Sequence, residues 1–162
     1  NFIKKNKINF FMNTHQSDTE SFLDFIKNLN LRNINFLKQY TDIYPLLFFS
    51  DLLITDYSSI YTDYLKLKKP ILFFRPDKFR FETEVGIFDE NIFFCGKEVL
   101  NLDELLNEIK KIKNSSEIYL NKYKQKIEAA CKFFSLNNNS NNEMILNELK
   151  KVMVIKSTYW FR

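Results

Sequence analysis

The chain has 162 residues, 45% of them hydrophobic, and a formal net charge of +4. This composition is sufficient for a domain with a hydrophobic core and excludes a disordered chain. The lysines are spread along the sequence, as on a solvated surface, so we expect no nucleic-acid partner. Cys95 and Cys131 are too few for a disulfide framework, and every apolar run is shorter than the ~20 residues that a membrane span needs.

The first third of the chain predicts alternating short strands and helices. The sequence begins at Asn1, and we interpret residues 1–7 as a linker or the end of a preceding segment of a larger protein. Apolar runs predict strands over 8–13 and 34–37. Helical spacing predicts helices over 21–29 and over 43–49, with Asp42 as the N-cap of the second helix.

The same alternation continues to the end of the chain. We expect strands at 52–55, 71–74 and 92–95, with a helix at 60–67 and a loop-rich stretch from 75 to 90. Leu102, Leu105, Leu106, Ile109 and Ile112 share one helical face, and Asn101 is the candidate cap. Further helices are predicted at 116–134 and 142–154, separated by an Asn-rich loop.

Short strands that are apolar on both faces and alternate with helices are typical of a parallel sheet covered on two sides. The fold class is therefore predicted to be α/β, a Rossmann-like parallel sheet with helices on both faces. Ligands of such sheets bind beyond the carboxyl ends of the strands.

One of those carboxyl ends carries a cluster of polar residues, in the segment ITDYSSIYTDY from 54 to 64. Here Ser58 and Ser59 precede the helix expected at 60–67, where hydroxyl and backbone N–H groups suit an anion such as phosphate. The same serines would also serve as a simple helix cap. No glycine-rich cradle is present, so any phosphate must be met by hydroxyls.

Four stretches resemble the CDP-glycerol glycerophosphotransferase family of teichoic-acid-type polymerases and primases. They are SDLLITDYSSIYTDYLKLKKPILFF, NFFMNTH, PDKFRFETEVGIF and FDENIFFCGKEVLNLDELLNEI, and together they span roughly residues 8–152. The resemblance implies the C-terminal, donor-binding half of a GT-B-type transferase. It places the donor-binding domain at 8–155 and a C-terminal tail at 156–162.

The resemblance also implies the partners of the chain. The donor would be CDP-activated and the acceptor a polymeric or lipid-linked molecule, with a separate N-terminal domain completing the active site. No cofactor and no metal are expected, because the CDP-linked donor is itself the substrate. The family implies a location in the cytoplasm at the inner face of the membrane, with a possible peripheral membrane contact.

By the same resemblance, Ser58 and Ser59 would hydrogen-bond the donor diphosphate, and Asp56 and Tyr57 would shape the turn. His15, the single histidine of the chain, would lie at a strand end as the catalytic residue. A histidine there can neutralise phosphate as a cation or move a proton as a neutral imidazole.

Two further residues follow the strand expected at 71–74. Asp77 is a candidate contact for the ribose or base. Arg75 is a candidate contact for a phosphate, although the family typically carries an aromatic residue at the position of Arg75. The chain departs from the family pattern at Gln16, where proline is usual, and at Val85, where arginine is common. These departures leave two alternatives open: a nucleotide-sugar glycosyltransferase of capsule synthesis, and a non-catalytic nucleotide-binding module.

Overall fold

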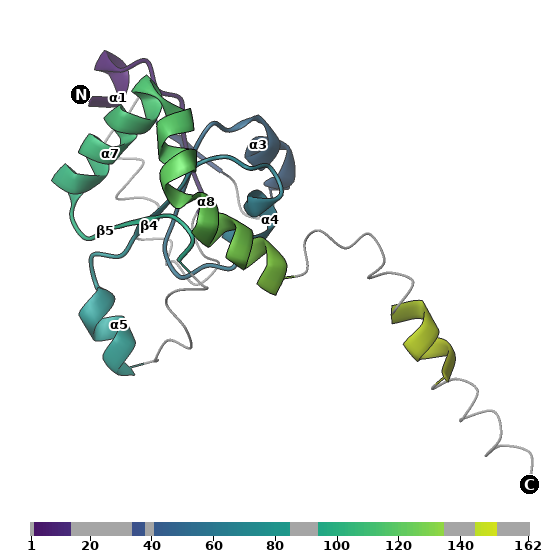
Figure 1. Cartoon of the computed structure of the whole chain (residues 1–162). Helices are drawn as coiled ribbons and strands as arrows, with labels where there is room; N and C mark the ends of the chain where they lie inside the picture. Colours follow the sequence, from purple (N-terminus) through teal and green to yellow (C-terminus); the bar gives the residue numbers. More distant parts are fainter. Residues whose placement is uncertain (1, 14–33, 38–40, 85–93, 135–144, 152–162) are drawn as a thin grey trace, which may run out of the picture. The chain divides into compact units, whose positions relative to one another are not determined.

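The computed structural model describes residues 2–13, 34–37, 41–84, 94–134 and 145–151 (Figure 1). The chain divides into two compact units, Asn1–Phe49 and Ser50–Arg162. Each unit is described by itself.

The first unit contains a parallel pair of strands. Helix α1 (Phe2–Lys5) lies within the segment interpreted as a linker, and it precedes strand β1 (Phe10–Met12). Strand β2 (Ile34–Phe36) pairs with β1 in parallel, which confirms both predicted strands with slightly shorter bounds. Helix α3 (Tyr44–Phe49) follows, and Asp42 accepts a hydrogen bond of 3.0 Å from the backbone N–H of Tyr44. The helix expected at 21–29 lies outside the described residues.

The second unit is built on a three-stranded parallel sheet in the order β3-β4-β5. Its strands are β3 (Leu53–Thr55), β4 (Ile71–Phe74) and β5 (Lys97–Val99). Thr55 is paired with Phe73, and Phe74 with Val99. The carboxyl ends of all three strands therefore lie at one edge of the sheet.

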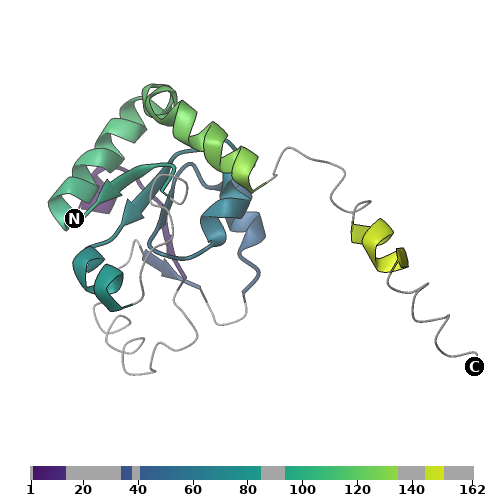
Figure 2. The ribbon, with the colours of Figure 1, turned by 60° about the horizontal axis from the view of Figure 1, so that its bottom comes forward.

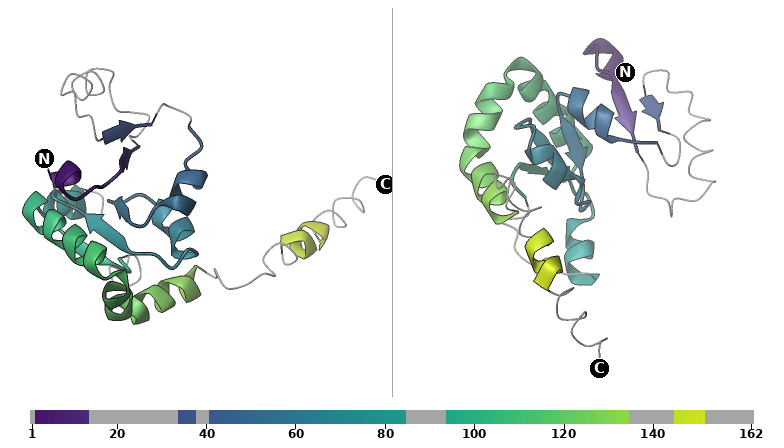
Figure 3. Two further views of the ribbon diagram at one scale, coloured as in Figure 1. Left: turned by 90° about the horizontal axis from the view of Figure 1, so that it is seen from above. Right: turned by 90° about the vertical axis from the view of Figure 1, so that its right-hand side faces the viewer.

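Four helices accompany this sheet (Figures 1 and 2): α4 (Ile60–Leu65), α5 (Lys78–Glu84), α7 (Leu102–Asn114) and α8 (Ser116–Phe133). The Asn101 side chain caps α7 by accepting a hydrogen bond of 2.9 Å from the Glu104 N–H, as its sequence predicts. Ser115 caps α8 in the same way. The two long predicted helices are thus confirmed, and Figure 3 shows them beside the sheet. The end of α8 also reaches α4, where the Phe134 ring contacts that of Tyr61.

Strand β4 is covered on both faces, which explains its unbroken apolar sequence. Neighbouring side chains of a strand point to opposite faces. Leu72 packs with a core cluster from β5, α7 and α8. Phe73 contacts the rings of Tyr61 on α4 and of Phe94, with centroids 5.3 and 5.0 Å away. The predicted α/β class, a parallel sheet flanked by helices, is confirmed.

The structure corrects three boundaries. The stretch from 75 to 90 was expected to be loop-rich, but residues Lys78–Glu84 within it form α5. Phe94 and Cys95 are not in a strand, because β5 lies further along at Lys97–Val99. Helix α4 ends at Leu65 rather than at 67, since Lys68 adopts a positive φ of 52° in the turn that leads to β4.

Residues 145–151 form a further helix inside the one predicted at 142–154. Across the described ranges, no helix combines the length and apolar character needed to cross a bilayer.

Candidate nucleotide site

The turn after β3 presents two serine hydroxyls at the carboxyl edge of the sheet. The Asp56 carboxylate accepts a hydrogen bond of 3.1 Å from the Ser58 N–H, which closes the turn. Ser59 occupies the N-cap position of α4 but makes no side-chain capping bond, and Ser58 Oγ lies 3.5 Å from the Ile60 nitrogen. Both serines are exposed. Their hydroxyls are thus available to a ligand rather than committed to a strong cap.

The short helix behind this turn is anchored by a buried tyrosine. Tyr64 is 0% exposed, and its hydroxyl donates a hydrogen bond of 3.1 Å to the carbonyl of Ser50. The ammonium of Lys69 donates to the same carbonyl at 2.7 Å. These contacts hold α4 against the start of β3, which fixes the direction in which the serines face.

The turn after β4 lies beside the turn after β3. The hydroxyl of Tyr57 donates a hydrogen bond of 3.1 Å to the carboxylate of Asp77. The Tyr57 ring stacks on Phe81 of α5, with centroids 3.5 Å apart and planes inclined by 6°. Five of the residues singled out in the sequence, Asp56, Tyr57, Ser58, Ser59 and Asp77, are therefore brought together at one edge of the sheet.

Arg75 is fully buried next to Tyr57. Its guanidinium forms ion pairs with Glu98 of β5 and, at 2.8 Å, with Glu82 of α5. The guanidinium carbon lies 3.9 Å from the Phe94 ring centre and 5.0 Å from that of Tyr57. Direct contact between Arg75 and a phosphate remains a prediction, and the described geometry places this side chain among protein partners.

Burial raises the pKa of the Tyr57 phenol above its usual value. The Arg75 guanidinium opposes this shift, and the hydrogen bond to the Asp77 carboxylate adds to it. Tyr57 is therefore protonated at neutral pH, and its hydroxyl is the donor of the hydrogen bond to the Asp77 carboxylate.

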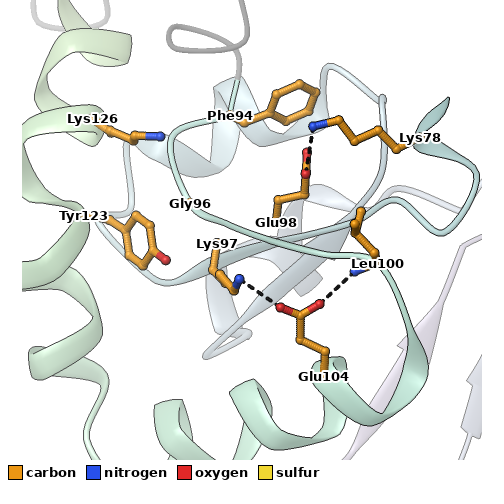
Figure 4. Close-up of a pocket in the computed structure, with 9 residues that line it drawn as sticks. All are labelled: Lys78, Phe94, Gly96, Lys97, Glu98, Leu100, Glu104, Tyr123 and Lys126. Atoms are coloured by element: carbon orange, nitrogen blue, oxygen red, sulfur yellow. Dashed lines mark hydrogen bonds and ion pairs between the residues drawn. The ribbon is translucent and has the colours of Figure 1, made fainter. Parts of the chain in front are cut away.

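A cavity of about 340 Å³ opens beside β5 (Figure 4). Tyr123 and Lys126 project into it from α8, and Lys78 lies on the opposite side. Two of its walls are ion pairs: Lys78 with Glu98 at 3.0 Å, and Lys97 with Glu104 at 2.8 Å. The remaining lining residues are Phe94, Gly96 and Leu100. Because Phe94 and Glu98 also touch Arg75, this cavity borders the Arg75 cluster.

The candidate catalytic residue His15 and the two departures Gln16 and Val85 lie outside the described residues. Within the part of the chain that the structure describes, no three His, Cys, Asp or Glu side chains converge in a way that would hold a metal ion.

Three residues that hold the site in place were not identified from the sequence. Phe81 and Glu82 were assigned to a loop, and Glu98 was not singled out. Their side chains meet Tyr57 or Arg75 because α5 and β5 bring them to the carboxyl edge. The helical spacing of Lys78 and Glu82 was a usable signal, since they form an i,i+4 pair at 3.6 Å.

A parallel sheet flanked by helices, with polar residues gathered beyond two strand ends, defines a Rossmann-like α/β domain. Such a domain occurs in many enzymes, so the fold alone does not give the chemistry. The chain belongs to the CDP-Glycerol:Poly(glycerophosphate) glycerophosphotransferase family, whose model matches residues 1–151.

Two curated relatives come from Bacillus subtilis (strain 168). A teichoic acid poly(glycerol phosphate) polymerase is 43% identical over 75 residues, which is 45% of this chain and 10% of the relative. A teichoic acid glycerol-phosphate primase is 35% identical over 77 residues, which is 47% of this chain and 20% of the relative.

The solved structures similar to this chain include the wall teichoic acid polymerase TagF. One, a variant soaked with CDPG, matches with a TM-score of 0.68 and 25% identity, covering 93% of this chain and 36% of that one. Another TagF structure matches with a TM-score of 0.65 and 22% identity, and the match covers 97% of this chain and 38% of the TagF chain. The chain therefore spans less than two fifths of these TagF chains.

Proposed function

We propose that this chain is the donor-binding part of a CDP-glycerol glycerophosphotransferase that builds a teichoic-acid-type polymer. The observation that carries the proposal is the pair of exposed serine hydroxyls, Ser58 and Ser59, at the carboxyl edge of a parallel sheet in a chain of this family. The TagF variant soaked with CDPG, similar to this chain over 93% of its length, supports the choice of donor.

In the proposed site, the two serine hydroxyls donate hydrogen bonds to the donor diphosphate. Asp56 keeps the turn closed through its bond to the Ser58 N–H. Asp77, held by the Tyr57 hydroxyl, faces the ribose or the base. This arrangement suits phosphoryl transfer, because that chemistry depends mainly on positioning and on charge stabilisation.

In the proposed reaction, a hydroxyl of the acceptor attacks the β-phosphorus of CDP-glycerol. A new phosphodiester forms, the bond between the two phosphates breaks, and CMP leaves. His15 remains the candidate to hold or move a proton at this centre. The acceptor is proposed to be a polymeric or lipid-linked molecule, and the reaction to occur at the cytoplasmic face of the membrane with the help of a further domain.

The test is a donor panel with the full-length protein that contains this chain. Release of the nucleotide product is measured in the presence of a glycerol phosphate acceptor: CMP from CDP-glycerol or from a CMP-sugar, and UDP from a UDP-sugar. The proposal predicts turnover with CDP-glycerol alone, and loss of that turnover in the Ser58→Ala/Ser59→Ala variant. Equal turnover by this variant, or a preference for a nucleotide sugar, would contradict it.

A matched control for the double variant is Ser116→Ala. Ser116 is exposed and opens α8, one turn before Tyr119, whose hydroxyl reaches the first residue of β4. It therefore lies toward the amino end of the sheet, away from the proposed site, and turnover should be unchanged.

A further inference from the structure

We infer that Arg75 is a positioning residue of the nucleotide site. Its guanidinium, held by Glu82 and Glu98, fixes the ring of Tyr57 and so the turn that carries Ser58. This inference rests on the proposed function, because it assigns a role within the same site.

Arg75 is buried behind its acidic partners. The side chain is 0% exposed, whereas its carboxylate partners Glu82 and Glu98 are 32% and 26% exposed. A phosphate could reach the guanidinium only by displacing one of these carboxylates. Both pairs are charge-assisted hydrogen bonds, and displacing either carboxylate would remove one of the two partners that neutralise the fully buried guanidinium.

The partners of Arg75 come from separate elements. Glu98 belongs to β5, and Glu82 belongs to α5. Lys78 joins the same cluster, 3.0 Å from Glu98 and 3.6 Å from Glu82. Arg75 itself continues the sheet, since its N–H donates to the Val99 carbonyl at 2.9 Å. The guanidinium is thus fixed relative to the sheet and to α5 together.

The fixed guanidinium lies against the residue that precedes the two serines. The guanidinium carbon lies 5.0 Å from the ring centre of Tyr57, the residue before Ser58. The Tyr57 ring also stacks on Phe81 of α5, while Phe94 lies 3.9 Å from the same guanidinium. A planar guanidinium can lie against the rings while it donates to two carboxylates, and a lysine ammonium does not reproduce both sets of contacts at once. The contact with Tyr57 is therefore the route by which Arg75 can position the serine turn.

The test is a double-mutant cycle on CDP affinity, measured by calorimetry on the chain. Arg75→Lys keeps the charge but lacks the planar group, and Tyr57→Leu removes the ring. We expect each variant to weaken CDP binding about tenfold, and the double variant to bind no more weakly than Tyr57→Leu alone. Additive losses of about a hundredfold would overturn the inference in favour of direct phosphate contact, and unchanged binding by Arg75→Lys would overturn it as well.

Arg80→Gln is the matched control. Arg80 lies on α5 in an exposed i,i+4 pair with Glu84 at 3.1 Å, so its loss should leave CDP affinity unchanged. A comparable loss of affinity in Arg80→Gln would mean that any change on α5 disturbs the site, which would contradict a specific role for Arg75.

A second readout does not need a nucleotide. 3-Fluorotyrosine placed at Tyr57 reports its surroundings through the ¹⁹F resonance. We expect this resonance to move in Arg75→Lys and to stay in place in Arg80→Gln, and an unmoved resonance in Arg75→Lys would overturn the inference. If the wild-type chain binds no CDP but the resonance moves, the proposed function fails while the coupling of Arg75 to Tyr57 stands.

Discussion

The hydroxyl of Tyr57 donates a hydrogen bond to the carboxylate of Asp77, which joins the turns that follow two neighbouring strands. Tyr57→Phe removes this donor and keeps the stacked ring. One hydrogen bond contributes about 0.5–1.5 kcal/mol, so CDP binding should weaken by roughly twofold to tenfold. Calorimetric titration measures the change.

Asp77→Asn provides the complementary variant. The amide oxygen of asparagine still accepts from the Tyr57 hydroxyl, so the link between the turns is kept while the charge is lost. A normal affinity in Tyr57→Phe would show that the link contributes nothing to the site.

Tyr119 bridges two strands at the start of their ladder. Its buried hydroxyl donates to the Ile71 carbonyl of β4 and accepts, at 2.7 Å, from the Lys97 N–H of β5. Tyr119→Phe leaves the buried Ile71 carbonyl and the partly buried Lys97 N–H without this partner. The free energy of unfolding should fall by about 1–3 kcal/mol in urea denaturation.

Tyr123→Phe is the control for that substitution. Tyr123 packs against Tyr119 with ring centroids 4.7 Å apart, but its hydroxyl makes no hydrogen bond within the described residues. Its removal should change stability by less than about 0.5 kcal/mol. Equal losses in the two variants would contradict the bridging role of Tyr119.

Gly96 is required by a close approach of two backbones. A Cβ at this position would lie 2.1 Å from the Ile71 carbonyl oxygen and 3.0 Å from the Tyr119 hydroxyl. Since the carbonyl belongs to the sheet, it cannot move aside freely. Gly96→Ala should destabilise the fold by about 1–3 kcal/mol or more, whereas Asn107→Ala on the exposed side of α7 should be close to neutral. Wild-type stability in Gly96→Ala would mean that β4 and β5 are not held this closely.

Stability should depend on pH through Glu104. The hydrogen bond from Lys97 and that from the Leu100 N–H lower the pKa of this carboxyl. A lowered pKa in the folded state stabilises the fold above the unfolded pKa of about 4.3, and this contribution is lost as the pH falls through the folded value. The same pair raises the pKa of Lys97, so its contribution is also lost in strong base.

Urea denaturation between about pH 6 and pH 3 tests this assignment. The stability of the wild type should fall more steeply with decreasing pH than that of Glu104→Gln. Parallel curves for the two proteins would contradict it. Glu108→Gln, which removes a carboxylate paired with Lys111 at 2.6 Å on α7, is a useful comparison.

Local signals predicted most of the elements. The apolar run at 71–74 predicted β4 with its bounds, because both of its faces are covered. Asn101 and the spacing of the leucines predicted α7, since capping and amphipathicity are local properties. The segment Lys78–Glu84 was included in the stretch expected to be loop-rich. It forms α5, where Phe81 stacks on Tyr57 and Glu82 pairs with Arg75.

Only part of the site could be predicted from the sequence. The serines and Asp77 follow strand ends, so their shared edge could be deduced from a parallel sheet. The partners of Arg75 could not, because Glu98 lies 23 residues away in the sequence and meets it only through the pairing of β4 with β5. Long-range pairing of charges leaves no local pattern in one sequence.

The central claim is tested most directly by calorimetric titration of the chain with CDP, in the wild type and in Ser58→Ala/Ser59→Ala. The account predicts that CDP binds the wild type in preference to UDP and GDP, and that the double variant loses at least about tenfold in affinity. CDP binding of equal strength by the two proteins would contradict the assignment of these hydroxyls to the donor diphosphate.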